Sequence, residues 1–460
     1  MSFRSKFIGN KHFYRTVLGI ALPIMVQNGI STFVSMLDNL MVGRLGTESM
    51  AGVSIVNQFT FIFSLVVFGA VSAAGIFMAQ FHGKGDREGE MYTFRFKLLI
   101  CLFVGLAGVA VIWYFRSSFI NFFLYSGDSK GDLKLTFAEA ERYLLVVLGS
   151  LLPFAIANAY ASSMRETGDT VTPMVASIAA VVTNFVLNYL LIFGSFGAPK
   201  MGVQGAALAT VVSRIVELLI LVVRTHVKSG KYAYVIGAFR SPKIPKKLLG
   251  QIAARGLPLV ANESLWSVAV TLSNQCYATR GLDVVAANSI YSTVWNVFSV
   301  AFLSMGSAIA IMIGNLLGAG KLDEAKDTSS KLIAFSVFCA LLTAGVMAGI
   351  SGVFPLLYNT TDEARSLATF MILIAAVMMP FSAFTNAAYF TIRSGGKVLV
   401  TMLFDSVFMW VVLFPLVFVL SRCTDMPIRP LFTIGLSTDI LKCLLGYLML
   451  RRGTWVKQLT

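Results

Sequence analysis

The chain has 460 residues, of which 57% are hydrophobic and only 13% are charged. Soluble domains are about half apolar and a quarter charged, so this composition excludes a soluble enzyme and a disordered chain. The five cysteines are an odd number and form no CxxC pair, which excludes a disulfide scaffold. Since a transmembrane helix needs about 20 apolar residues, the composition predicts a membrane protein with many spans.

The charge is unevenly distributed, with 37 Lys and Arg against 22 Asp and Glu. In a soluble protein this excess would indicate a nucleic-acid partner, but the positive-inside rule predicts it without one. The segment 224–256 is basic and contains no acid, and the tail from Arg451 is also basic. We therefore expect a multi-pass protein of the cell membrane with both termini cytoplasmic, in contact with membrane lipids and with no nucleic-acid partner.

Continuous apolar runs follow one another along the whole chain. They lie near 15–41, 52–81, 96–116, 142–163, 172–194, 202–224, 251–278, 285–317, 331–357, 367–391, 399–420 and 430–450. Their hydrophobicity is continuous rather than alternating, which favours helices over the strands of a barrel. The expected fold class is an all-α integral membrane protein with twelve transmembrane helices.

The two halves of the chain resemble each other. The matched residues are Pro23 and Pro258, Gly46 and Gly281, Pro153 and Pro380, and Arg165 and Arg393. Because six is even, both halves enter the membrane in the same direction, as in transporters built from parallel repeats. We expect an N-terminal six-helix lobe at 1–223, a basic cytoplasmic linker at 224–250 and a C-terminal six-helix lobe at 251–460. Such pseudo-symmetric bundles enclose a central cleft.

Polar residues within the spans are the candidates for function. Asp38 leads, because an acid inside a membrane helix is costly and is by default a functional hypothesis. Asn184 and Asn188 lie one turn apart on the fifth span. They would either join helices by hydrogen bonds or, with Asp38, supply oxygen ligands for a small cation. Thr210 in the sixth span would add a fourth ligand.

The second half of the chain carries further candidates. Glu263 lies in the seventh span, and Trp266 follows one turn later, where it would either pack or stack on an aromatic cation. Asp405 in the eleventh span is expected to be an unpaired acid and a tentative residue of the substrate cleft. Two pairs at i, i+3 are expected to neutralise themselves, namely Arg214 with Glu217 and Asp439 with Lys442. The remaining acids favour cations in the cleft.

Several motifs occur in one order along the chain. They are LDNLMVGRLG (37–46), RETGDT (165–170), LNYLLIFGSFGAPKMGVQGAALAT (187–210) and LPLVANESL (257–265). Together they resemble the multidrug and toxic compound extrusion (MATE) family over nearly the whole chain. The Leu-Asn-Tyr after Asn184 and the acid Glu263 look like its NorM-like branch.

This resemblance implies a monomeric secondary active exporter of organic, mostly cationic compounds and drugs, driven by inward H⁺ or Na⁺ without a cofactor. It implies a cation site at Asp38, Asn184, Asn188 and Thr210, a second cation-binding acid at Glu263 and a helix hinge at Pro23. Some members carry an acid where this chain has Asn188, so the coupling ion stays open. The family's partner acid for Glu263 falls near Ser382, where there is no carboxylate. Whether Glu263 meets an ion or the substrate also stays open.

Two other functions remain as alternatives. A lipid-linked oligosaccharide flippase of the same superfamily would carry unpaired Arg or Lys within its spans to bind pyrophosphate. A channel or a membrane-embedded receptor is the other, although the repeat argues against it. An enzyme is not expected, since GNLLGAGKL (314–322) departs from the phosphate-binding loop and HExxH and GxSxG are absent.

Overall fold

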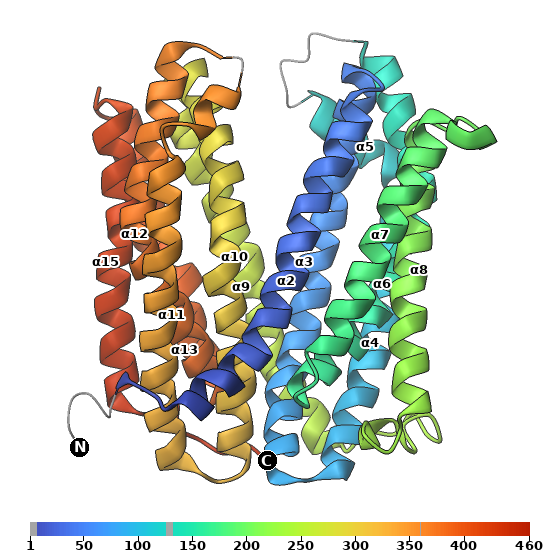
Figure 1. Cartoon of the computed structure of the whole chain (residues 1–460), viewed down its shortest axis with the longest axis vertical. Helices are drawn as coiled ribbons and strands as arrows, with labels where there is room; N and C mark the ends of the chain where they lie inside the picture. Colours follow the sequence, from blue (N-terminus) through green and yellow to red (C-terminus); the bar gives the residue numbers. More distant parts are fainter. Residues whose placement is uncertain (1–6, 126–131, 359) are drawn as a thin grey trace. The chain divides into compact units, whose positions relative to one another are not determined.

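The computed structural model describes residues 7–125, 132–358 and 360–460, and within these ranges it contains helices and no strand (Figure 1). The helices of the first half are α2 (Lys11–Gly43), α3 (Thr47–Lys84), α4 (Arg87–Tyr114), α5 (Arg116–Tyr125), α6 (Leu133–Glu166), α7 (Val171–Phe193) and α8 (Val203–Val227). The second half contains α9 (Lys246–Ala278), α10 (Leu282–Gly318), α11 (Leu322–Ile350), α12 (Asp362–Ser394), α13 (Val398–Met402), α14 (Phe414–Arg422) and α15 (Ile428–Arg452). Two π-helical segments, η4 (Leu403–Val407) and η5 (Met409–Leu413), join α13 to α14, and short 3-10 turns lie at η1 (Ser195–Gly197), η2 (Ala233–Val235) and η3 (Phe354–Leu357).

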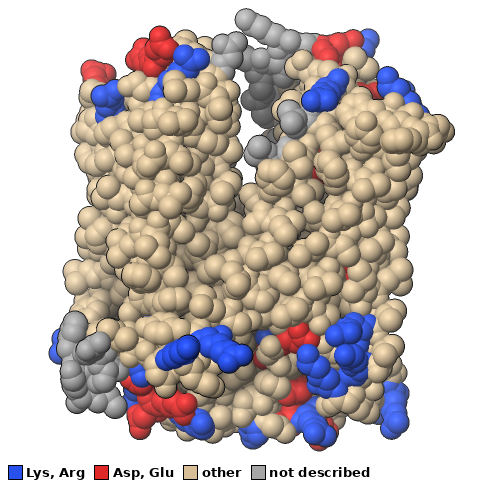
Figure 2. Space-filling view, viewed as in Figure 1, with Lys and Arg blue, Asp and Glu red and all other residues tan. Residues whose placement is uncertain are grey.

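Eleven helical segments in the described residues are long and apolar enough to cross a membrane. The expected seventh span lies in α9, which is as long as the others but richer in polar residues. Large apolar side chains such as Phe103, Trp113 and Leu342 are exposed, as expected for surfaces that face lipid. In each unit of the molecule the charged side chains gather at the two ends (Figure 2). The all-α membrane fold expected from the sequence is confirmed.

The chain folds into two compact units. The carboxy-terminal unit comprises Met1–Met25, Ala79–Gly85 and Leu257–Thr460, and the amino-terminal unit comprises Val26–Met78 and Asp86–Gly256. The division between the units runs through α2 just after Pro23 and through α9 just before Pro258. A proline inside a helix removes a backbone hydrogen bond and favours a kink. The three-part division expected from the sequence stays a prediction, because compactness alone does not define membrane lobes.

In the amino-terminal unit, α6 packs against α4 and α8, and α7 packs on α8. Gly52 brings α3 against the backbone of α6, since a Cβ at Gly52 would lie 2.8 Å from the Ala140 nitrogen. The core of this unit includes Phe59, Tyr143 and Leu151. This packing frames the cavity described below.

In the carboxy-terminal unit, α12 packs against α10, α11 and α15. Its core includes Phe302, Met379 and Phe432. The first half of α2 joins this unit through Val17 and Ala21, which pack in a second apolar cluster with Met305 and Trp455. The helix α12 is therefore the centre of this bundle.

Candidate functional site

The amino-terminal unit contains a cavity of about 470 Å³ bounded by α2, α3, α6, α7 and α8. This volume lies within the range of small-molecule sites, about 300–1,000 Å³. Its polar lining consists of Ser35, Asp38, Asn39, Asn57, Thr60, Ser64, Tyr143, Ser150, Asn188, Thr210 and Arg214. Phe61, Phe63 and Phe154 supply aromatic surface. The cavity therefore combines apolar walls with a dense set of hydrogen-bonding groups.

The four residues expected at a cation site lie together in this unit. The Asn188 Nδ2 donates to Asp38 Oδ1 at 2.6 Å and to Asn184 Oδ1 at 3.1 Å. The Asn184 Nδ2 lies 3.5 Å from Thr210 Oγ1. Asn184 and Asn188 are both buried, so the contacts are made away from bulk solvent. The i, i+4 spacing places both amides of α7 on the face that meets α2 and α8.

One oxygen atom of this cluster has unsatisfied acceptor capacity. The buried Asn188 Oδ1 has no hydrogen-bond partner among the described residues. Turning the Asn184 amide over would place its nitrogen 3.0 and 3.1 Å from the two oxygens of Asp38. The oxygen atoms of Asp38 and Asn188 thus fit a small hard cation or a proton.

Arg214 brings a positive charge into the same cavity. Its Nη1 donates to Glu217 Oε2 at 2.8 Å, so the expected pair on α8 is confirmed. The guanidinium also lies over the Phe154 ring, 5.1 Å from its centroid. Sequence reasoning missed that Arg214 lines the cavity together with Asp38, because a pair within one helix gave no sign of what else its members face.

A second polar cluster lies in the carboxy-terminal unit. The Tyr389 hydroxyl donates to Glu263 Oε1 at 3.3 Å, and Asn262 Nδ2 donates to Asp405 Oδ2 at 3.1 Å. The Lys442 Nζ donates to Asp405 Oδ1 at 2.6 Å. The expectation of an unpaired Asp405 is therefore wrong, because Lys442 of α15 reaches it across the helix interface.

The expected Asp439–Lys442 pair is also wrong. Lys442 bonds Asp405, while Asp439 Oδ2 accepts a hydrogen bond from the Ser382 hydroxyl at 2.6 Å. Ser382 of α12 is the position where the family resemblance calls for a partner acid to Glu263. The Asp439 carboxylate of α15 lies beside it. Asp405 itself lies in the π-helical segment η4, a kind of helix irregularity often found at functional sites. Trp266 on α9 is partly exposed, at 39%.

A protein-family model described as MatE matches residues 23–190 and 258–419. The chain belongs to this family. It is the multidrug and toxic compound extrusion family that the sequence motifs resemble, and the two matched regions begin at Pro23 and Pro258, the prolines paired by the repeat.

Proteins similar to this MATE chain span nearly its whole length. It is 24% identical to the "Probable multidrug resistance protein NorM" of Thermotoga maritima, over 96% of this chain and 93% of that protein. It is 26% identical to the "Multidrug resistance protein PmpM" of Pseudomonas aeruginosa, over 86% and 81% of the two chains. The solved structure of the Vibrio cholerae MATE transporter VcmN in the bent form superposes with a TM-score of 0.84 at 19% identity, covering 97% of this chain and 99% of that one. The last likeness shows a shared fold.

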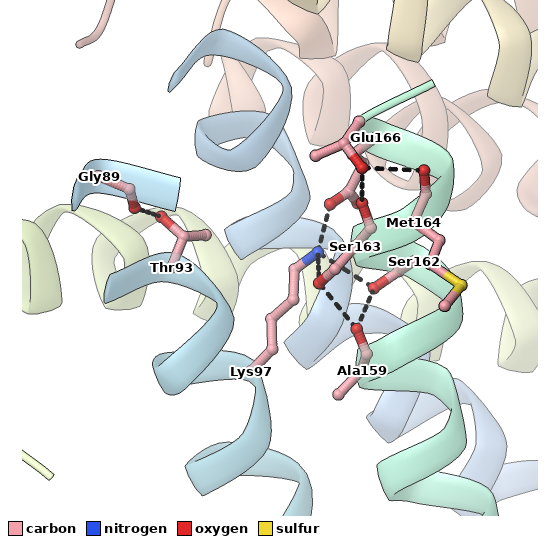
Figure 3. Close-up of polar contacts among 9 residues, drawn as sticks. Gly89, Thr93, Lys97, Ala159, Ser162, Ser163, Met164 and Glu166 are labelled. Atoms are coloured by element: carbon pink, nitrogen blue, oxygen red, sulfur yellow. Dashed lines mark hydrogen bonds and ion pairs between the residues drawn. The ribbon is translucent and has the colours of Figure 1, made fainter. Parts of the chain in front are cut away.

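A buried ion pair joins α4 to α6 in the amino-terminal unit of this MATE protein. Lys97 of α4 is fully buried and pairs with Glu166 at the end of α6, while its Nζ also donates to Ser162 Oγ at 3.0 Å (Figure 3). Gly75 of α3 lies against Glu166 Oε1, so a Cβ at this position would crowd the carboxylate. This pair could not be predicted from the sequence, since its members are far apart in the chain.

Acids and bases alternate from the cavity to this buried pair. Arg214 acts electrostatically on Asp38 and pairs with Glu217. Arg165 in turn lies in the electrostatic field of both Glu217 and Glu166. The order is Asp38, Arg214, Glu217, Arg165, Glu166 and Lys97. We call these six residues the charge row.

The basic linker is attached to the amino-terminal unit by specific contacts. Arg95 donates from Nε to the Ala238 carbonyl at 2.8 Å, and Lys231 Nζ donates to Asp169 Oδ2 at 2.7 Å. Burial raises the pKa of Asp169, but hydrogen bonds from Lys231, Tyr232 and Thr172 outweigh it and hold that pKa well below its usual range. The hydrogen bond to Asp169 raises the pKa of Lys231. The linker is therefore an ordered part of this unit as well as a run of positive charge.

Proposed function

We propose that this protein is a secondary active exporter that couples efflux of organic, mostly cationic compounds to inward movement of H⁺ or Na⁺ at Asp38. The observation that supports it best is the convergence of Asp38, Asn184, Asn188 and Thr210 beside a drug-sized cavity in a MATE-family chain. The relatives that carry multidrug-resistance names support the substrate class.

The geometry suggests how ion occupancy changes the site. With an ionised Asp38, the Asn184 amide presents its nitrogen to the carboxylate at 3.0–3.1 Å. With a proton or cation on Asp38, the amide presents its oxygen instead, and Asn188 Oδ1 is available as a further ligand. Loading and unloading would therefore change the hydrogen bonds that join α2 to α7. An ion that favours one packing shifts the equilibrium between the two states by its difference in affinity for them.

Other parts of the chain take the following roles in this proposal. Pro23 is the hinge of α2, close to the point where this helix leaves one unit and enters the other. Glu263 offers a second acid, to an ion or to the substrate, and Trp266 lies one turn further along α9. The protein works as a monomer in the cell membrane, with both termini in the cytoplasm.

The flippase alternative has less support. A site for a lipid-linked pyrophosphate needs positive charge that is not already neutralised. Lys97, Arg214 and Lys442 lie within membrane helices, and each pairs with an acid. These pairs favour the drug-exporter proposal over transport of a pyrophosphate-linked sugar.

Ethidium efflux from proteoliposomes tests the proposal. The full-length protein is reconstituted, and an inward proton gradient or an inward Na⁺ gradient is imposed one at a time. We expect uphill ethidium movement with one of the gradients and its loss when an ionophore collapses that gradient. Asp38→Asn should remove gradient-driven efflux while leaving the amount of reconstituted protein unchanged. Ethidium flux that ignores both gradients would indicate a channel and overturn the proposal.

A further inference from the structure

The acid cluster of the carboxy-terminal unit contains a cation that belongs to the chain itself. The Lys442 Nζ donates to Asp405 Oδ1 at 2.6 Å, and the Lys442 side chain is only 9% exposed. Asp439 lies three residues before Lys442 on α15 and acts electrostatically on the same ammonium. The Lys442 Nζ also lies 5.4 Å from the centroid of the Phe404 ring. One buried positive charge therefore serves two carboxylates.

The other printed contacts of these two carboxylates come from neutral donors. Asp405 Oδ2 accepts from Asn262 Nδ2 at 3.1 Å, and Asp439 Oδ2 accepts from the Ser382 hydroxyl at 2.6 Å. The Ser406 hydroxyl holds the Asn262 amide in place, since it donates to Asn262 Oδ1 at 2.7 Å. Neutral donors orient a carboxylate, but they leave its charge in place. The charge of Asp405 is therefore compensated by the ammonium of α15.

Two further charged groups, Glu263 and Arg393, belong to the same polar network. Arg393 exerts the largest charge effect on Glu263, and Asp405 exerts a smaller one of opposite sign. The Tyr389 hydroxyl donates to Glu263 Oε1 at 3.3 Å, and the Arg393 guanidinium lies 5.8 Å from the centroid of the Tyr389 ring. Glu263 therefore has a base of its own, which leaves the ammonium of α15 to the other two acids.

The cluster around Asp38 in the amino-terminal unit is built differently. Asp38 accepts a hydrogen bond from a neutral amide, Asn188, whose own Oδ1 has no hydrogen-bond partner among the described residues. The base that acts on Asp38, Arg214, is bonded to Glu217. The amino-terminal cluster thus offers free oxygen to an ion, whereas Lys442 places a compact ammonium with three donors at the acids of the other unit.

We propose that Lys442 is a tethered counter-ion that fills a cation site at Asp405 and Asp439, so that this site takes no ion from solution. The ammonium carries the charge of one monovalent cation, and its covalent attachment gives it a high effective concentration beside the acids. Without the lysine, two carboxylates would face the vacated space, and hard cations favour such oxygen ligands. In the proposed exporter, on which this last consequence rests, Asp405 and Asp439 add no ion to the transport cycle.

Thermal stability of the full-length protein in nanodiscs, measured against Na⁺ concentration, tests this inference. Every variant also carries Asp38→Asn, which removes the carboxylate of the amino-terminal cluster. N-methylglucamine⁺ is exchanged for Na⁺ at constant ionic strength and mildly alkaline pH, so that protons compete little. A cation that binds the folded state raises the melting temperature. We expect Lys442→Met to lower the Na⁺ concentration for half-maximal stabilisation at least tenfold, and added Asp405→Asn to abolish that gain.

Two further variants control for the loss of a lysine. Lys442→Arg keeps a positive charge beside Asp405, so its melting temperature should respond to Na⁺ as that of the parent does. Lys326→Met is the matched control, because Lys326 is an exposed lysine of α11 that pairs with an acid three residues away. Its response to Na⁺ should equal that of the parent.

Two results would overturn the inference. In the first, Na⁺ stabilises the parent with Lys442 present and Asp405→Asn removes that stabilisation, which would mean that the lysine does not fill the site. In the second, Lys442→Met folds and responds to Na⁺ no more than Lys326→Met does. The first comparison uses only variants that keep Lys442, so it decides the matter even where Lys442→Met does not fold.

Ethidium efflux separates this inference from the exporter proposal. A wild type without gradient-driven efflux would remove the exporter proposal, while the Na⁺ titration of Lys442→Met would still decide whether the lysine is a counter-ion. Gradient-driven efflux together with a Lys442→Met variant that gains no Na⁺ binding would leave the exporter standing and remove the counter-ion.

Discussion

Removing Lys97 should destabilise the protein strongly. The Nζ of Lys97 is enclosed, and Glu166 is only 14% exposed, so Lys97→Met leaves a carboxylate in a poorly solvated place. Breaking a buried pair by deleting one partner costs about 3–5 kcal/mol. Because Arg165 also acts on Glu166, we expect the lower end of that range, about 3 kcal/mol. Native proteins are stable by about 5–15 kcal/mol in total, so this is a large fraction.

A double-mutant cycle separates the pair from its surroundings. Lys97→Met with Glu166→Gln removes both charges, and the free energy of unfolding should return to within about 1 kcal/mol of the wild type. Unfolding is followed in nanodiscs by denaturant titration for the wild type, both single variants and the double variant. Lys134→Met is the matched control, since Lys134 is an exposed base on α6 and its loss should change stability by about 0.5 kcal/mol or less.

Two results would contradict the dependence of these charges on each other. In the first, Lys97→Met would unfold at the same denaturant concentration as Lys134→Met, which would mean that the buried charges do not depend on each other. Alternatively, the double variant would be no more stable than the single one, which would assign the loss to packing of the lysine stem rather than to the stranded carboxylate.

Three further predictions concern the cavity and the linker. Asp38→Asn should abolish drug resistance in cells with near-normal membrane expression; full resistance would remove Asp38 from the mechanism. Asn188→Ala removes the 2.6 Å bond to Asp38, a charge-assisted contact worth about 1.5–3 kcal/mol, so the ion concentration for half-maximal efflux should change at least tenfold. The contact between Asp169 and Lys231 stabilises the linker while both groups are charged. Asp169 contributes to that stability above its unfolded pKa of about 3.9, and Lys231 contributes below its unfolded pKa of about 10.4. Because the pKa of Asp169 is lowered and that of Lys231 raised, protection of the linker from trypsin should be constant from pH 6 to 9 and should be lost in Asp169→Asn at every pH.

The polar cluster around Asp38 was predictable because its signals are local. Asn184 and Asn188 share a helix face by their spacing, and a carboxylate at Asp38 within an apolar run is unusual enough to indicate function. The resemblance to the MATE family then added Thr210 to them. Periodicity and the cost of buried charge were sufficient to predict this much.

The ionic contacts between helices could not be predicted in the same way. The spacing of Asp439 and Lys442 satisfies the rule for neighbours on one helix, yet Lys442 binds Asp405 on another segment. Whether Lys442 pairs with Asp439 or with Asp405 depends on how α15 faces η4. The two π-helical segments there rotate the side chains away from a regular helical pattern. Lys97 and Glu166 have no local relation at all, so only packing of α4 against α6 reveals them.

The charge row has a consequence for the response to membrane voltage. With each group in its usual ionisation state, its three acids balance its three bases, so the row as a whole carries no net charge. An elementary charge moved across 100 mV gains or loses about 2.3 kcal/mol. In the proposed exporter, the field therefore does almost no work on these six side chains when the bundle moves with Asp38 empty. It would do work once a positive ion had neutralised that carboxylate, so the potential should speed the loaded step and leave the return step nearly indifferent to voltage.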